Sequence, residues 1–549
     1  MPQERPPRDA ATLVVLRDAA GGPQVLLMQR PETRDHTSGA WVFPGGVVDP
    51  QDRVAQACCS GLDDAQASAL LGVPQGGLGF HVAALRECFE ESGLLFAQPL
   101  PAGDDAPWDG WRERLHRGER TLADFCRDTG LRFAVDRIAY LSHWVTPLGR
   151  AKRFDTRFFV ALAPAGQRAR HDGREMLDHR WLGAAEALAQ GDALKLMGPT
   201  RATLQWLSAF DSAQAALDAA RRPREIPRTL PRTAQGPSGE RPVLPHEPAW
   251  EEIGRLDPTG QGLARHDIRA GVPVRLSPRV IRVTAPNAGV MTGPGTNSYL
   301  VGGGARNEWA VIDPGPADAA HVDALLAAAP GAIRWIFATH THSDHSPAAV
   351  PLQARTGAAV LGRRPLHPDR QDPHFAPQRE LQHGERCRLD GATLRVIHTP
   401  GHASNHLCFL LEEERLLFTG DHVMQSSTVV INPPDGDMAA YLTSLQALRD
   451  EPVDWLAPGH GFLMAQPVRV FDALVAHRLK REAKVRQALQ TAGPATAEAL
   501  LPAVYDDVDP RLLPIALRSL TAHLLKLRGD GLAAADEHAG SVTWRPAGP

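Results

Sequence analysis

Short apolar runs alternate with turn-forming residues in the first part of the chain. The runs Ala11–Leu16, Val25–Met28 and Phe158–Leu162 have the length and composition of buried strands, and Gly and Pro separate them from one another. Stretches with helical periodicity lie among them. The pattern therefore predicts a mixed α/β domain over residues 1–215.

A second series of apolar runs predicts another α/β domain, over residues 271–475. Each run is followed by a turn and often by an Ala/Leu-rich helix; the runs are Asn297–Val301, Trp309–Ile312, Ile333–Thr339, Thr393–Ile397 and Arg415–Phe418. From about His477 the pattern becomes helical, and a hairpin is expected around Gly529–Trp544. Three helices and a β-hairpin predict a small winged-helix-like domain over residues 476–549.

Residues 216–270 separate the two α/β domains. Within them, Arg221–Pro248 holds seven prolines in 28 residues. Proline removes backbone donors and blocks helices, which favours an extended, semi-rigid connector. The stretch is also locally basic, so an arm that contacts nucleic acid is the alternative.

Composition narrows the class of protein. With 549 residues, 43% hydrophobic and 22% charged, the chain is neither mostly disordered, fibrous nor membrane-embedded. The formal net charge of −4 is too balanced to indicate nucleic-acid or membrane binding by itself. Six cysteines without C-x-x-C spacing are expected to be reduced. We expect a cytoplasmic protein with no membrane association, because the sequence shows neither a signal peptide nor a long apolar span.

The first candidate site is a set of acidic residues with helical spacing. Glu87, Glu90 and Glu91 lie at positions i, i+3 and i+4, which brings their carboxylates together on one helical face. Val82, Leu85 and Phe89 fall roughly opposite, so we expect the helix to pack its apolar side and to present the acids outward. Clustered carboxylates suit Mg²⁺ or Mn²⁺. A solvated acidic helix face is the alternative.

The residues around these acids resemble a known signature. Arg86–Leu94, RECFEESGL, is similar to the second half of the Nudix box, and Trp41–Gly46, WVFPGG, to its glycine loop. The spacing departs from the family pattern, because Asp52 stands where a Glu is usual and 33 residues separate it from Arg86. This insertion, together with His143–Pro147 and Arg153–Ala161, resembles the branch of coenzyme A diphosphatases.

The Nudix resemblance, over about residues 8–215, implies an α/β/α fold that hydrolyses a small-molecule diphosphate. By it, Glu87, Glu90 and Glu91 would be metal ligands and catalytic residues. Arg153 and Arg157 would bind phosphate, since guanidinium groups match phosphate geometry; surface salt bridges are the alternative. The displaced half of the signature leaves open a module that binds a ligand without turning it over.

The second candidate site is built from histidines and aspartates that follow strands. ATHTHSDHS comes directly after an apolar run, and TPGHASNH, FTGD and APGHG follow three others; the candidate ligands are His340, His342, Asp344, His345, His402, Asp421 and His460. Loops at the ends of strands in one sheet open at the same edge, so distant ligands can converge there. Imidazole and carboxylate without thiolate favour zinc, with iron or manganese as alternatives.

These motifs together resemble the metallo-beta-lactamase superfamily, which implies a central αββα sandwich and a pair of zinc ions. By that resemblance His340, His342 and His402 would hold one ion and Asp344, His345 and His460 the other. Asp421 would bridge them, and Asp344 and Asp421 would also be catalytic. Two cations that share a hydroxide hydrolyse their substrate at neutral pH.

Within the superfamily, residues from about Arg279 to Ala533 resemble the lactamase-beta-like endoribonucleases. This resemblance implies cleavage of RNA phosphodiesters, with single-stranded RNA as a partner along a basic helix; the basic positions are His477, Arg478, Lys480, Arg481, Lys484 and Arg486. His406 would contact substrate or support a ligand. Hydrolysis of thioesters of the glyoxalase II kind is the alternative. His383 and His422 are interpreted as structural, and the sequence leaves oligomeric state open.

Overall fold

The computed structural model describes residues 6–32, 38–99, 108–369, 371–425, 428–538 and 541–547. The chain forms two compact units. Unit 1 contains residues up to Ala234, with Glu240–Pro245 and Thr259–Gly262. Unit 2 contains the rest, including everything from Leu263 onward. Across the described residues no helix is long and apolar enough to cross a membrane.

Unit 1 is built on a mixed sheet. Its strands are ordered β10-β2-β1-β9-β8-β11, while β3 pairs with β2 and β4 with β1. The bounds are β1 Arg8–Ala19, β2 Gly22–Gln29, β3 Trp41–Val42, β4 Gly45–Val47, β8 Ala139–Val145, β9 Phe154–Leu162, β10 Asp178–Gly183 and β11 Arg228–Thr229. The central strands β1 and β9 are parallel, and β1 pairs antiparallel with β2.

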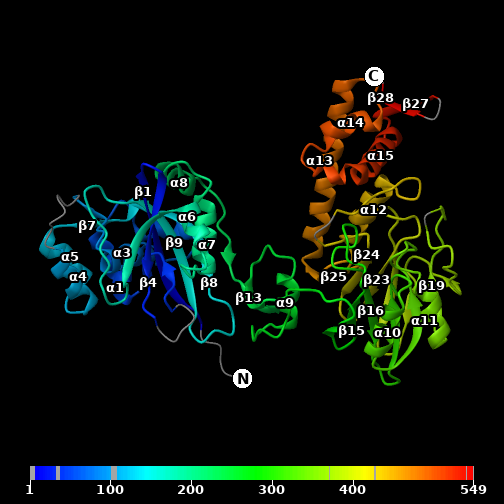
Figure 1. The fold of residues 1–549 in the computed structure, drawn as a ribbon, viewed down its shortest axis with the longest axis horizontal. Coiled ribbons are helices and arrows are strands. Elements are labelled where there is room, and N and C mark those ends of the chain that lie inside the picture. The colour runs from blue at the N-terminus through cyan, green and yellow to red at the C-terminus, as the bar shows by residue number, and fades with distance from the viewer. Residues whose placement is uncertain are drawn as a thin grey trace. The chain divides into compact units, whose positions relative to one another are not determined.

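Helices cover both faces of this sheet (Figure 1). Leu13 and Val15 of β1 pack with the core around α3, whereas Val14 and Leu16 pack on the opposite face. Because successive side chains of a strand point to opposite faces, one apolar run can fill both cores. The helices are α3 Gly77–Ser92 on the first face, and α6 Ala184–Ala189, α7 Gly198–Leu207 and α8 Ala213–Arg221 on the second. The predicted α/β/α arrangement is confirmed.

The long insertion between Asp52 and Arg86 is folded. It forms α2 Asp64–Leu71, the first half of α3 and part of a small sheet ordered β5-β7-β6. The further elements in and after it are α1 Pro50–Val54, η1 Ala55–Cys58, β5 Cys59–Ser60, β6 Ala97–Gln98, α4 Asp109–His116, α5 Leu122–Thr129, β7 Arg132–Ala134 and η2 Val135–Arg137. These elements bury α3 on sides that a typical surface helix would expose.

The segment expected to be an extended connector, residues 216–270, contains regular structure. It holds the end of α8, β11, a two-stranded sheet of β12 Arg232–Gly236 and β13 Gly239–Val243, and α9 Trp250–Leu256. Within Arg221–Pro248 the elements after α8 are short strands, which are extended backbone as expected, and α9 begins only after Pro248. The role of residues 216–270 as a linker stays a prediction. Proline is tolerated at turns and in strands that lack a neighbour on one side, so its density does not prevent this local folding.

Unit 2 contains two sheets packed face to face. The first is ordered β14-β15-β16-β17-β18-β19-β20 and the second β21-β22-β23-β24-β25-β26. The bounds are β14 Val274–Ser277, β15 Val280–Thr284, β16 Asn297–Gly302, β17 Glu308–Ile312, β18 Ala332–Phe337, β19 Ala359–Gly362, β20 Arg379–Glu380, β21 Arg386–Arg388, β22 Thr393–His398, β23 Leu407–Leu411, β24 Leu416–Gly420, β25 Trp455–Pro458 and β26 Met464–Ala465. Tyr299, Phe337, Phe409 and Phe418 fill the core between them.

Helices cover the outer faces of both sheets, which confirms the αββα sandwich. Helices α10 Ala319–Ala328 and α11 Ala349–Thr356 lie against the first sheet, and α12 Met438–Leu448 against the second. A C-terminal winged-helix domain follows, made of α13 Pro467–Ala492, α14 Ala497–Val504, η3 Pro510–Leu512, α15 Leu513–Gly529, β27 Ala533–His538 and β28 Ser541–Pro546.

Helix α13 joins the sandwich to the winged-helix domain without a break (Figure 1). Phe471, near its start, packs in the core beside α12, whereas Val485 and Leu489 pack in the winged-helix core. The helix thus runs across the boundary placed between residues 475 and 476. Because one rigid element belongs to both cores, the winged-helix domain is fixed beside the sandwich.

Two candidate metal centres

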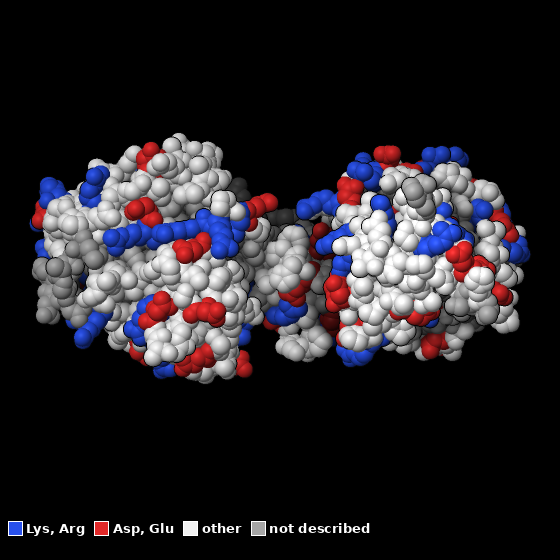
Figure 2. Space-filling view, turned by 90° about the horizontal axis from the view of Figure 1, so that it is seen from above, with Lys and Arg blue, Asp and Glu red and all other residues white. Residues whose placement is uncertain are grey.

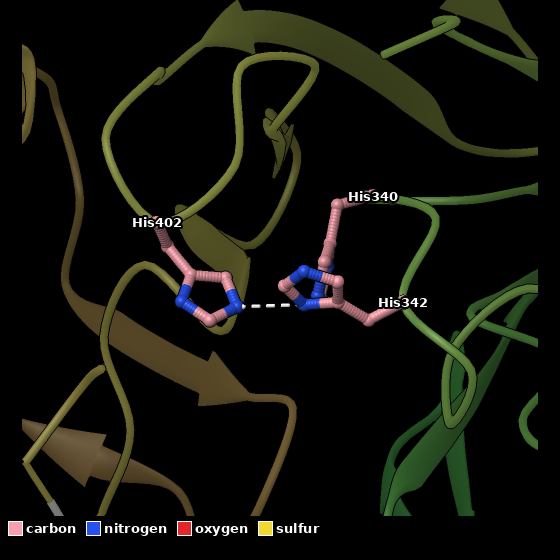
Figure 3. Close-up of side chains that lie close together, drawn as sticks. All are labelled: His340, His342 and His402. Carbon is pink, nitrogen blue, oxygen red and sulfur yellow. Dashed lines mark hydrogen bonds between the residues drawn. The ribbon is translucent and has the colours of Figure 1, made fainter. Parts of the chain in front are cut away.

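The histidine and aspartate motifs of unit 2 occupy loops at one edge of the sandwich. His340, His342, Asp344 and His345 follow β18; the other three candidates follow β22, β24 and β25, and are His402, Asp421 and His460. Figure 3 shows His340 and His342 on one loop and His402 on another, with His402 turned toward them. Strands of both sheets thus bring distant residues to one place.

Their side chains lie close enough to share ions. Ligand atoms lie within 4.8 Å of one another in three groups: His340, His342 and His402; His340, His345 and Asp421; and Asp344, His345 and His460. The Nε2 of His402 is 2.9 Å from Nδ1 of His342. The Oδ1 of Asp421 lies 3.3 Å from Nε2 of His345 and 3.2 Å from Nε2 of His460. Asp421 therefore lies between the groups.

Hydrogen bonds from the far side fix the orientation of these rings. Nδ1 of His402 lies 2.7 Å from the carbonyl of Val430, and Nδ1 of His460 lies 3.2 Å from that of Gly295. Nδ1 of His345 is 2.9 Å from Oδ2 of Asp313. An acceptor at Nδ1 holds the ring so that Nε2 faces the cluster, where it can bind a cation.

Several atoms that face the centre of the cluster have no hydrogen-bond partner. They are buried, and they are Nε2 of His340, His345 and His460 and Oδ1 of Asp421. Buried polar atoms without partners are costly unless an ion or water satisfies them. Unpartnered nitrogen and oxygen atoms aimed at one point fit divalent cations well.

Charges in this centre are strongly coupled. Although burial opposes it, Asp344, Asp421 and Asp313 raise the pKa of His345 well above its ordinary value. Burial lowers the pKa of His342 to about 3, and His402 beside it adds to this effect. The surrounding carboxylates thus favour positive charge at this point, which a bound cation would supply.

Unit 1 carries the second candidate centre, on α3. All three predicted glutamates are largely buried, with side-chain exposures of 13% for Glu87, 9% for Glu90 and 4% for the whole Glu91 residue. The expectation that they face outward is wrong, because the folded insertion and the glycine loop cover the helix. Oε2 of Glu91 accepts the backbone N–H of Gly45 at 2.9 Å.

Arg86 holds the two parts of the separated motif together. Its guanidinium pairs with both carboxylate oxygens of Asp52, at 2.9 and 3.0 Å, and lies 3.0 Å from Glu87 and 3.1 Å from Glu90. Asp52 is 1% exposed. The residue that stands in place of the usual Glu therefore still neutralises this arginine across the insertion.

Burial makes the carboxylates of α3 unusually weak acids. It raises the pKa of Glu87 to about 7, although Arg86 beside it opposes the change. It raises the pKa of Glu91 well above its ordinary value, and Glu87 adds to this. Such carboxylates need a proton or a cation when buried together. The donor set is all oxygen, which fits Mg²⁺ or Mn²⁺.

Glu175 is a residue near this centre that the sequence did not reveal. Its charge adds to burial in raising the pKa of Glu90 and Glu91, although it lies on a loop far along the chain.

The two arginines predicted to bind phosphate contact other protein groups. NH1 of Arg157 is 2.7 Å from His143, and Arg157 forms a close ion pair with Asp155. Nε of Arg153 donates to the carbonyl of Thr146. The phosphate-binding role of these arginines stays a prediction.

Comparisons with known families match every part of this arrangement. The model of the metallo-beta-lactamase superfamily matches residues 291–460, and that of the beta-lactamase associated winged helix domain matches residues 496–544. The model described as NUDIX domain matches residues 6–59, and the NUDT19 Nudix domain model matches residues 60–195.

Curated relatives match about half of the chain. An atrochrysone carboxyl ACP thioesterase of Aspergillus chevalieri is 32% identical over 281 residues, which are 49% of this chain and 87% of that protein. A beta-lactamase-like protein 2 homolog of Caenorhabditis elegans is 32% identical over 266 residues, 47% of this chain and 87% of that protein. The chain belongs to the metallo-beta-lactamase superfamily.

This superfamily member carries an N-terminal Nudix domain, and both domains make it a metal-dependent hydrolase. A solved NUDIX hydrolase from Alicyclobacillus acidocaldarius is 29% identical, with a TM-score of 0.34, and the match covers 39% of this chain and 96% of that one. Both families imply divalent metal ions. The side chains that meet at the centre of unit 2 are those that the sequence motifs selected. The ligand role of the three glutamates of α3 stays a prediction.

Two further histidines, His406 and His422, lie buried beside the metallo-beta-lactamase centre. His406 is fully buried, its Nδ1 is 2.9 Å from the hydroxyl of Thr399, and its ring stacks on His340 at 5.1 Å. From this position His406 can support the metal ligand His340, but it does not reach the surface where a substrate would bind. His422 is also fully buried, against Tyr441, and His383 accepts the backbone N–H of His398.

A large cleft opens from this centre toward the winged-helix domain. Its volume is about 1280 Å³, and its walls include Val290 and Met291 together with Val508, Leu512 and Ile515. Both Val290, 74% exposed, and Met291, 44% exposed, are large apolar side chains left in solvent. The cleft therefore offers apolar surface that leads to the metal-binding residues.

The basic helix expected to contact RNA is largely occupied within the protein. Arg478 donates to the carbonyl of Val429, Arg481 pairs with Asp507 at 2.8 Å, and Lys484 forms a close ion pair with Asp506. Lys480 and Arg486 remain exposed. On the face that Figure 2 presents, basic and acidic side chains of unit 2 are interspersed with uncharged surface.

Proposed function

We propose that unit 2 hydrolyses acyl thioesters at a pair of zinc ions held by the seven histidine and aspartate side chains. The Nudix domain in unit 1 would hydrolyse a diphosphate of the coenzyme A or nucleoside type, with Mg²⁺ or Mn²⁺. This choice places thioester hydrolysis ahead of RNA cleavage, which stays a prediction. The observation that carries it is the character of the cleft.

The charged residues of the cleft do not favour a polyanion. Apart from the proposed zinc ligands, its walls contain three arginines, Arg478, Arg481 and Arg518, and two aspartates, Asp369 and Asp435. Two of these arginines already bind protein groups. Binding of RNA depends on cations that neutralise phosphates, so such a surface contributes little to it.

The apolar walls suit an acyl chain. Val290 and Met291 face a cleft whose other wall carries Leu512 and Ile515, and burying their exposed surface against a substrate would contribute about 25 cal/mol per Å². The curated relatives named as ACP thioesterases act on acyl groups attached by a thioester, which supports the same substrate class.

The chain's own residues prepare the reaction. When two divalent cations are bound, they lower the pKa of a water and polarise the attacked carbonyl. Asp313 and the carbonyls of Val430 and Gly295 orient the ring nitrogens toward the cations, and the hydroxyl of Thr296 donates to Asp344 at 3.1 Å. The apolar walls would hold the acyl chain and exclude other water.

In the Nudix domain, Glu87, Glu90 and Glu91 would hold the cation that neutralises the diphosphate. Arg86 and the N–H of Gly45 already fix two of these carboxylates in place. Preorganised ligands reduce the cost of assembling the site at the moment of reaction. Glu175 supplies a further carboxylate near Glu90 and Glu91.

The thioester proposal is tested with a substrate panel on the full chain loaded with zinc. We expect turnover of acyl-CoA thioesters, and for Met291→Ser a rise in KM that is larger for a dodecanoyl than for an acetyl thioester. Val272→Ser is the matched control, because Val272 is 45% exposed and does not line the cleft. Cleavage of single-stranded RNA without thioester turnover would instead support the phosphodiester prediction.

The Nudix proposal is tested with Mg²⁺ on coenzyme A and ADP-ribose. Glu91→Gln should abolish diphosphate hydrolysis and leave thioester turnover unchanged, whereas the exposed Glu119→Gln should affect neither. Tight binding of these compounds by the unaltered chain without turnover would support a ligand-sensing module.

A further inference from the structure

A cluster of potential metal ligands lies in unit 1 apart from the carboxylates of α3. His171, Asp178 and His179 each offer one ligand atom, and these atoms lie within 4.8 Å of one another. The Nδ1 atoms of the two histidines are only 2.9 Å apart, and their rings are tilted by 49°. All three side chains are partly buried.

The two segments that carry the cluster are held firmly. Before His171, the backbone N–H of Arg170 donates to the carbonyl of Ser92 at 2.7 Å, at the end of α3. After it, Asp172 accepts the backbone N–H groups of Glu175 at 3.0 Å and Met176 at 2.8 Å. The short loop is therefore shaped without any contribution from the histidines.

The other two ligands lie on the sheet. Asp178 and His179 begin β10, and they pair with Gln29 and Met28 of β2. The pairing places the His179 side chain on the same face as Met28, which packs in the core around α3. The cluster thus joins the edge of the sheet to the loop beside the C-terminal end of the Nudix helix.

The chemistry of the donors selects the kind of ion. The cluster offers two imidazole nitrogens and one carboxylate oxygen, one from each side chain. Two imidazoles and a carboxylate suit zinc and similar transition metals, whereas Mg²⁺ prefers oxygen ligands. The cluster therefore differs in selectivity from the glutamate centre of the same unit.

We propose that His171, Asp178 and His179 form a zinc site that clips the loop of residues 170–177 to β10. Bound there, the ion would replace the single proton that the two facing imidazoles can share. Because the loop also carries Glu175, whose charge acts on Glu90 and Glu91, the clip would fix the surroundings of the Nudix carboxylates.

The test measures zinc per chain by equilibrium dialysis of the full protein at a fixed free Zn²⁺ concentration. We expect His171→Gln and His179→Gln each to bind about one zinc ion fewer than the unaltered chain. His116→Gln, at an exposed histidine of the same unit, should bind as much zinc as the unaltered chain. Equal zinc content in all four proteins would overturn the proposal.

Hydrogen exchange locates the ion independently of stoichiometry and of folding defects. Zinc should slow exchange of amides in residues 170–180 of the unaltered chain at least tenfold more than in Asp178→Asn, whose two histidines are intact. An equal effect of zinc on both proteins would count against the site. Neither readout depends on the diphosphatase or thioesterase activity.

Discussion

The buried ion pair between Glu252 and Arg282 predicts that α9 is essential to the stability of unit 2. The Glu252 carboxylate accepts hydrogen bonds from both terminal nitrogens of Arg282, at 2.7 and 2.9 Å, and from the backbone N–H of Leu463 at 2.8 Å. The two side chains are 3% and 2% exposed. One partner comes from the segment expected to be a connector and the other from β15.

Removing either charge alone would leave the other buried without its partner. We expect Glu252→Gln and Arg282→Met each to destabilise unit 2 by about 3 to 5 kcal/mol. The double variant removes both charges, and its glutamine can still accept the Leu463 N–H, so it should lose less than either single variant.

Native-state hydrogen exchange of amides in β15 and β16 measures this, because it reports the opening of unit 2 separately from unit 1. The single variants should exchange roughly 10² to 4 × 10³ times faster than the unaltered chain. If the destabilisation of the double variant equals the sum of the two single effects, the loss of stability does not come from breaking the ion pair, and the prediction is wrong.

Three further predictions concern the metal centres. Asp313→Asn should weaken zinc binding about 10- to 100-fold, because Asp313 orients the ring of His345. The control is Asp323→Asn on the surface, and equal zinc affinities of the two variants would contradict the role of Asp313 in orienting His345. Gly46→Ala should lower diphosphate turnover about a hundredfold and leave thioester turnover unchanged, because the Cβ of the new alanine would lie 2.3 Å from Oε1 of Glu87 and displace that carboxylate. Unchanged diphosphate turnover would show that the position of the Glu87 carboxylate does not matter for the reaction. Mg²⁺ should bind the Nudix domain about tenfold more tightly at pH 8 than at pH 6, since Glu87, with a pKa of about 7, must lose its proton; calorimetry that finds no pH dependence would refute this.

The sequence was most informative where several ligands follow strands in succession. Strand ends of packed sheets meet at one edge, so His340, His402, Asp421 and His460 could be placed together without coordinates. Asp313 could not, since a single aspartate after β17 looks like an ordinary turn residue. Only the fold reveals that it accepts from both His345 and Thr339.

Predictions from local pattern failed where distant segments decide burial. The spacing of Glu87, Glu90 and Glu91 is that of one helical face, but the glycine loop and an insertion without a recognisable signature bury the helix. Proline density in residues 216–270 concealed α9 because its stability comes from Arg282 and Leu463, far along the chain. Local propensity carries no information about such contacts.

Anomalous diffraction from crystals of the zinc-loaded chain, recorded at the zinc edge, tests the dinuclear centre of unit 2 most directly. Two peaks about 3.5 to 4 Å apart are expected between His340 and His460, both in contact with Asp421. A single peak there, or zinc only at other places, would contradict the assignment of this unit as a two-metal hydrolase.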